Sequence, residues 1–110
     1  MKTWHVALAA LSLSLAVTVA QAEDAVVVGV VAKDGKFEPA TLEVPAGKRI
    51  RIEVSNQGKK PIEFESKGLK FEKVIAPGAK SSVVVNALKP GEYAFFDEFS
   101  PDAKGKVVAR

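Results

Sequence analysis

Cysteine is absent from the 110-residue sequence, and histidine, methionine and tryptophan each occur once, at His5, Met1 and Trp4. Without cysteine, no disulfide can cross-link the fold and no thiolate can bind a metal ion. Because the other three residues lie at the extreme N-terminus, their removal would leave no imidazole or thioether. A metal would then be held by oxygen alone, and nucleophilic catalysis by a Cys–His or Ser–His pair would lack its general base.

The N-terminus has the pattern of a secretory signal peptide. A short segment with Lys2 precedes an apolar run over residues 6–20, and Ala20-Gln21-Ala22 supplies the small-x-small pattern of a cleavage site. The run is shorter than the ~20 residues that a membrane anchor needs. We therefore predict a signal peptide over residues 1–22, cleavage before Glu23 and a periplasmic protein.

Residues 23–110 form the predicted mature domain of 88 residues, which is enough for one modest core. Loss of Lys2 lowers the formal net charge from +3 to +2. The remaining charges are mixed along the chain rather than gathered in the basic stripe that nucleic-acid binding requires. We expect a single domain that is a monomer or a weak dimer and has no nucleic-acid partner.

Alternating apolar and polar residues predict an all-β fold. Residues 50–54 alternate apolar with charged side chains, and residues 62–66 alternate again, with Glu63 and Glu65 on the polar face. Short apolar segments separated by Pro/Gly turns about every 8–12 residues are typical of a Greek-key β-sandwich. We expect seven or eight strands, in residues 25–32, 41–44, 50–54, 62–66, 69–75, 81–88, the start of 91–101, and 105–110.

Residues 91–101 predict a strand that runs into a loop. Tyr93, Phe95 and Asp97 have the same parity and therefore point to one face of that strand. Two aromatic rings on that face belong in a core, where an unpaired carboxylate would be costly. Asp97 is thus either a metal ligand or an anchor that accepts hydrogen bonds from amides of the loop near Ser100.

The order of these segments resembles the cupredoxin family, which implies a cupredoxin-like Greek-key β-sandwich. The matching segments cover nearly all of the predicted mature chain. They are Phe37-Glu38-Pro39, Val44-Pro45-Ala46-Gly47, Val54-Ser55-Asn56, Ala76-Pro77-Gly78, Lys89-Pro90-Gly91-Glu92-Tyr93 and Gly105-Lys106-Val107-Val108.

The copper ligands of the blue-copper members are missing. Matched residue by residue, the positions of the two histidines, the cysteine and the methionine hold Ile62, Ser100, Asp97 and Ala103 here. A type-1 site needs two histidines and a cysteine with a weak axial ligand. We therefore expect no type-1 copper and no blue-copper electron transfer.

A narrower resemblance is carried by Glu63-Phe64-Glu65-Ser66, Glu72-Lys73-Val74 and residues 95–99. These segments are similar to the small cupredoxin-like proteins encoded with bacterial iron permeases and to the cupredoxin domain of imelysin-type iron-uptake proteins. The resemblance implies a periplasmic accessory protein that passes iron to a membrane permease, with other iron-uptake proteins as partners. Its implied iron ligands are the carboxylates of Glu63, Glu65, Glu72, Asp97 and Glu98.

The same resemblance raises a ferroxidase role. We do not expect an enzyme, because the sequence shows no electron acceptor, and many of the small relatives have His where Ser100 stands here. An all-oxygen shell would nevertheless favour iron(III) over iron(II). The alternative for the whole protein is a metal-free module that keeps the cupredoxin scaffold for contact with a partner.

The acidic residues themselves suit a hard cation. Glu63 and Glu65 lie two apart on one strand face, with their stems ~7 Å apart. Clustered carboxylates repel one another and raise a pKa, which a bound cation relieves. Oxygen ligands suit iron(III), calcium, magnesium or manganese. The alternative is a solvated strand face whose glutamates pair with Lys60, Lys67, Lys70 or Lys73.

Lysines surround these acids in the sequence. Lys59 and Lys60 precede them, and Lys67, Lys70 and Lys73 follow or interleave with them. We interpret the lysines as part of a solvated, charge-balanced surface. The alternative is a docking patch for an acidic partner or an anionic membrane.

Overall fold

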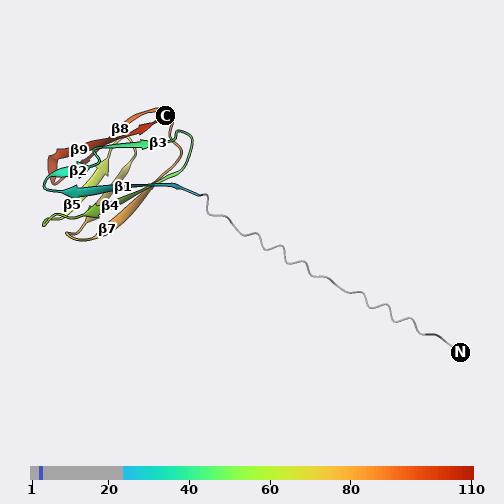
Figure 1. Cartoon of the computed structure of the whole chain (residues 1–110), viewed down its shortest axis with the longest axis horizontal. Helices are drawn as coiled ribbons and strands as arrows, with labels where there is room; N and C mark the ends of the chain where they lie inside the picture. The colour runs from blue at the N-terminus through green and yellow to red at the C-terminus, as the bar shows by residue number, and fades with distance from the viewer. Residues whose placement is uncertain (1–2, 4–23) are drawn as a thin grey trace.

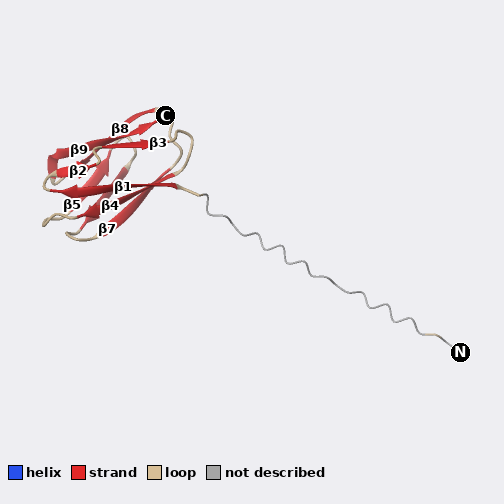
Figure 2. Cartoon of the chain, in the orientation of Figure 1, coloured by secondary structure: helices blue, strands red, loops and turns tan. Residues whose placement is uncertain are grey.

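The computed structural model describes residue 3 and residues 24–110, whose strands form a two-layered sandwich (Figure 1). Apart from residue 3, the predicted signal peptide and its cleavage site lie outside the described residues. Within residues 24–110 all regular structure is β-strand (Figure 2). No part of the chain that the structure describes forms a helix long and apolar enough to span a membrane.

Nine strands make up the two sheets. The first sheet has the order β2-β1-β4-β7, and the second has the order β3-β9-β8-β5-β6. Parallel pairing joins β1 to β4 and β3 to β9, whereas the other neighbours are antiparallel. The strands are β1 (Val26–Lys33), β2 (Lys36–Glu38), β3 (Thr41–Val44), β4 (Ile50–Asn56), β5 (Ile62–Ser66), β6 (Phe71–Ile75), β7 (Lys80–Val85), β8 (Gly91–Asp97) and β9 (Ser100–Ala109).

The expected all-β sandwich is confirmed, with one strand more than the upper expectation. The additional strand, β2, has only three residues and pairs with the end of β1. The Asp34-Gly35 turn before it, with both residues at positive φ, is typical of a tight hairpin, but three residues are too few to show a strand period. Strand β9 also begins at Ser100 rather than Gly105, since Ser100 pairs with Asp97 across a two-residue turn.

The side-chain parities predicted for the central strands are confirmed. Ile50, Ile52 and Val54 of β4 are buried, as are Ile62 and Phe64 of β5. Each strand therefore gives its alternate residues to the core between the sheets and the others to an outer face.

Aromatic rings occupy the centre of this core. Phe37, Phe64 and Phe95 come from β2, β5 and β8, and both Phe64 and Phe95 are fully buried. The ring centroid of Phe95 lies 5.2 Å from those of both Phe37 and Phe64 in edge-to-face geometry. Edge-to-face pairs at this separation are favourable beyond their buried area. This contact ties β8, the strand that carries Asp97, to both layers of the sandwich.

Candidate functional site

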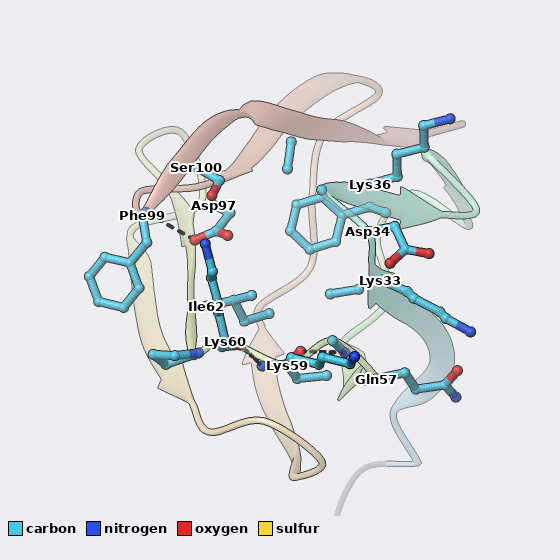
Figure 3. Close-up of a pocket in the computed structure, with 17 residues that line it drawn as sticks. Lys33, Asp34, Lys36, Gln57, Lys59, Lys60, Ile62, Asp97, Phe99 and Ser100 are labelled. Atoms are coloured by element: carbon cyan, nitrogen blue, oxygen red, sulfur yellow. Dashed lines mark hydrogen bonds between the residues drawn. The ribbon is translucent and has the colours of Figure 1, made fainter.

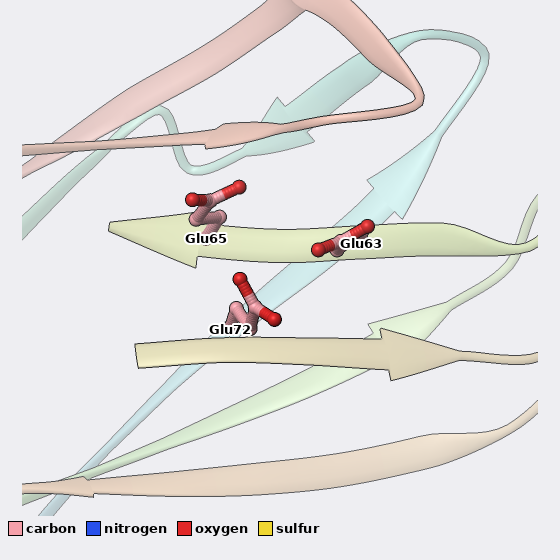
Figure 4. Close-up of side chains that lie close together, drawn as sticks. All are labelled: Glu63, Glu65 and Glu72. Atoms are coloured by element: carbon pink, nitrogen blue, oxygen red, sulfur yellow. The ribbon is translucent and has the colours of Figure 1, made fainter. Parts of the chain in front are cut away.

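Three glutamates meet on the outer face of the second sheet. Glu63 and Glu65 lie on β5, and Glu72 lies on the edge strand β6 directly opposite Glu65. One carboxylate oxygen from each of the three lies within 4.8 Å of the others (Figure 4). Like charges directly opposite one another disfavour strand pairing. No ion pair in residues 24–110 joins any of them to a lysine, so the expected alternative of neutralised pairs is not what the structure shows.

The turn between β8 and β9 brings Glu98 beside this glutamate cluster. The Glu98 amide donates to the Glu63 carbonyl at 2.9 Å, while the Glu63 amide donates to Asp97 Oδ1 at 2.9 Å. The backbone at Glu63 is thus fixed on both sides by the β8–β9 turn. This arrangement places Glu98, which is exposed, next to Glu63 and Glu65.

The surroundings disfavour the charged form of two of these carboxyls. Partial burial raises the pKa of Glu63 above its ordinary value, and the charges of Glu72, Glu98 and Asp97 raise it further. Partial burial also raises the pKa of Glu65, followed by the charges of Glu98, Glu72 and Glu63 and by a side-chain hydrogen bond with Glu98. A proton or a cation at this place would relieve the repulsion.

Removing the charge of Glu65 is therefore expected to stabilise the metal-free protein at neutral pH. Because the folded chain holds protons on Glu63 and Glu65 more tightly than the unfolded chain, stability falls as the pH rises from about 4.3 through the raised pKa values. The Glu65→Gln variant should melt at a higher temperature than wild type at neutral pH. Near about pH 3, where the carboxyls are protonated in both states, the two should melt together.

Thermal unfolding followed by circular dichroism, with a chelator present, measures this difference. Glu53→Gln is the matched control, because Glu53 lies exposed on the first sheet and outside the cluster. An equal gain in both variants would show that net charge alone, rather than repulsion within the cluster, governs the effect.

Asp97 lies on the other side of the same sheet. It is 4% exposed, and its Oδ1 accepts hydrogen bonds from the amides of Glu63 at 2.9 Å and Phe99 at 3.0 Å. The predicted parity of Phe95 and Asp97 is confirmed, since both are buried. Of the five predicted ligands, the structure brings Glu63, Glu65 and Glu72 together, sets Glu98 beside them and separates Asp97 from them. The anchoring role expected for Asp97 is the one its hydrogen bonds show.

The positions that match the copper ligands line an open cleft of about 680 Å³. Ile62, Asp97, Ser100 and Ala103 all border it (Figure 3). With no cysteine in the chain, these residues cannot form a type-1 copper site. The structure therefore separates the carboxylate cluster from the position that copper takes in the blue-copper members.

Four lysines border this cleft, of which two were not predicted from the sequence. Lys59 and Lys60 come from the segment before β5, and Lys33 and Lys36 from the β1–β2 hairpin. Lys33 and Lys36 were interpreted only as the ends of a turn. Because they flank Asp-Gly, which favours a two-residue hairpin turn, their spacing could have predicted a pair of like charges in opposite positions. The lysines that follow the acids in the sequence do not border the cleft.

The fold and the sequence together define the class of protein. The family model described as the cupredoxin-like domain matches residues 5–109. The chain therefore belongs to the cupredoxin-like family, as the order of its segments predicted.

Two relatives extend this assignment. The uncharacterized protein RP394 of Rickettsia prowazekii is 38% identical over 77 residues, which cover 69% of this chain and 62% of that protein. The iron uptake system component EfeO of Yersinia pestis is 38% identical over 108 residues, which cover 94% of this chain and 28% of EfeO. The chain thus spans less than two thirds of the length of either relative.

Solved structures show the same fold. Auracyanin B superposes with a TM-score of 0.66 at 16% identity, covering 80% of this chain and 96% of auracyanin B. The purple cupredoxin of Nitrosopumilus maritimus gives a TM-score of 0.59 at 18% identity, covering 74% and 98% of the two chains. At such identities the likeness concerns the fold alone.

Proposed function

We propose that this protein is a periplasmic accessory component of a bacterial iron-uptake system, which binds iron through carboxylates and passes it to a membrane permease. The observation that carries the proposal is the meeting of Glu63, Glu65 and Glu72 within 4.8 Å on one sheet face. The likeness to a protein named as an iron uptake system component supports the biological setting.

The donor set decides which cations fit. Glu63, Glu65 and Glu72 offer only carboxylate oxygens, and Glu98 adds a further carboxylate from the adjacent turn. Such oxygens suit hard cations, and iron(III) is one. Binding displaces protons from the raised pKa groups, so affinity rises with pH through that range.

The position of the cluster suits delivery rather than storage. Glu63 and Glu65 are half-buried and Glu72 is exposed, so one side of a bound ion would face solvent. Ligands from a receiving protein could replace water on that side of the ion before the glutamates release it. We assign binding and transfer, and no oxidation step, since the chain offers no electron acceptor.

Calorimetric titration with iron(III), supplied as its soluble nitrilotriacetate complex and corrected for titration of the same complex into buffer, tests the proposal. We expect one saturable site near neutral pH in wild type and a loss of at least about tenfold in affinity for Glu65→Gln. Asp97→Asn should stay within about twofold of wild type, because Asp97 lies on the opposite face of the sheet. Glu53→Gln controls for the loss of one negative charge.

Three results would overturn the iron proposal. Absence of binding by the wild-type protein would favour a metal-free scaffold that contacts a partner. Tighter binding of calcium than of iron, in a parallel titration, would reassign the cluster to an alkaline-earth ion. Equal losses in Glu65→Gln and Asp97→Asn would move the metal away from the cluster.

A further inference from the structure

We propose that the cleft at the end of the sandwich binds a small hydroxylated polycarboxylate, of which citrate is an example. In this assignment the lysines at the cleft bind the carboxylates, and Asp97 accepts a hydrogen bond from the hydroxyl group. The site is separate from the glutamate cluster and does not depend on its binding iron.

The lysines at the cleft form an unneutralised positive rim. Lys33 and Lys36 lie on one side and Lys59 and Lys60 on another, as Figure 3 shows. All four are exposed, and the ion pairs found in residues 24–110 involve none of them. The cleft also contains Asp34 and Asp97, so lysines outnumber acids there.

Two of the rim lysines are placed where their charges destabilise the fold. Lys33 and Lys36 are directly opposite partners across the β1–β2 turn. Like charges in directly opposite positions disfavour strand pairing. An anion bound between the hairpin and the facing loop would remove that repulsion.

Asn56 holds the second pair of lysines in place. This residue is buried, and its Nδ2 donates to the carbonyls of Lys60 at 2.8 Å and Ile75 at 3.0 Å. The Gly58 amide donates in turn to Asn56 Oδ1 at 3.0 Å. The backbone that carries Lys59 and Lys60 is therefore fixed before any ligand arrives, which lowers the entropy lost on binding.

In the proposed site, Asp97 recognises the hydroxyl group of the ligand by accepting its hydrogen bond. Both of its hydrogen bonds end on Oδ1. Because no side-chain N or O atom among the described residues is buried without a partner, Oδ2 keeps some contact with solvent, and Asp97 borders the cleft. A carboxylate oxygen accepts hydrogen bonds, so it favours a donor in the ligand and repels a further carboxylate.

The dimensions and the layout select a small organic anion. A volume of about 680 Å³ lies within the range of about 300–1,000 Å³ usual for small-molecule sites. The lysines stand on two separate segments, so a ligand with several carboxylates engages both, whereas one inorganic ion engages one. Asp97 then distinguishes hydroxylated members of this class from the others.

Titration of the purified protein with citrate in metal-free buffer at low salt tests the proposal, with amide chemical shifts as the readout. We expect saturable shifts at the β1–β2 turn, at Lys59, Lys60 and Ile62, and at the β8–β9 turn. Tricarballylate, which lacks only the hydroxyl group of citrate, should bind about tenfold more weakly. Inorganic phosphate should bind more weakly than either.

Two double variants separate the cleft from general charge. Lys33→Gln with Lys60→Gln should weaken citrate binding at least about tenfold. Lys67→Gln with Lys73→Gln removes the same charge outside the cleft and should change the affinity by no more than about twofold. All four positions are exposed, and the amide spectra report whether each variant folds.

Several outcomes would overturn the assignment. Unsaturable or absent shifts with citrate would remove the site. Equal affinity for citrate and tricarballylate would contradict the role of Asp97. Phosphate binding as tight as citrate would make the cleft an inorganic oxyanion site, and equal losses in the two double variants would reduce the effect to net charge.

Discussion

Replacing Gly105 with alanine is expected to destabilise the domain by about 3 kcal/mol, the upper end of the usual cost of overpacking a core. Gly105 lies opposite Phe95 in the β8–β9 pair, and a methyl group there would overlap the Ala40 carbonyl oxygen and the Phe95 ring. Neither neighbour can withdraw easily. The Ala40 carbonyl accepts a hydrogen bond from the Lys106 amide at 2.8 Å, and Phe95 is fully buried among other aromatic rings.

Urea unfolding at equilibrium measures this loss. Gly29→Ala is the matched control, because an added Cβ at Gly29 has no atom within 4 Å and the residue lies within β1. We expect this control to be neutral or slightly stabilising, since glycine weakens a strand. If Gly105→Ala unfolds at the same urea concentration as wild type, the close packing of β9 on Phe95 is contradicted.

Replacing Asp97 with alanine is expected to lower the free energy of unfolding by about 2–4 kcal/mol. The part-buried amides of Glu63 and Phe99 would lose their shared acceptor. The Asp97→Asn variant keeps an acceptor oxygen at the same place and should lose no more than about 1–2 kcal/mol. The ratio of the two losses distinguishes an anchor that accepts hydrogen bonds from a residue kept for its charge.

Chemical denaturation of both variants measures the ratio. Comparable losses in Asp97→Ala and Asp97→Asn would mean that the negative charge, and not the acceptor, holds the β8–β9 turn. A negligible loss in both would contradict the anchoring role and would return Asp97 to consideration as a metal ligand.

The sandwich could be predicted because its strands alternate cleanly. In β4 and β5 one face is apolar and the other charged, so the period of two alone decides which residues are buried. Strand β2 lacks such a signal, because three residues cannot establish a period. The early start of β9 depends on the pairing of Asp97 with Ser100, which no local pattern reveals.

The candidate site was predictable in part for the same reason. Spacing placed Glu63 and Glu65 on one face, but the approach of Glu72 depends on the β5–β6 register. The resemblance grouped Asp97 with Glu98, whereas the structure shows Asp97 buried and Glu98 exposed. Lys33 and Lys36 could not be grouped with Lys59 and Lys60 from the sequence, because the β1–β2 hairpin and the segment before β5 meet at the cleft only in the folded chain.

The two candidate sites are adjacent, and a hydrogen bond joins a residue of one to a residue of the other. The Glu63 amide donates to Asp97, which borders the cleft. Asp97 therefore helps to fix the backbone of the glutamate cluster. Asp97, which the sequence match aligns with the copper cysteine, serves this chain as a structural acceptor. We therefore place the proposed iron site on the outer face of the sheet.

Anomalous diffraction at the iron edge, from crystals of the protein prepared with iron, tests this conclusion most directly. We predict one peak between the carboxylates of Glu63, Glu65 and Glu72 on the outer face of the second sheet. A peak beside Asp97 in the cleft, or no peak from crystals saturated with iron, would contradict it.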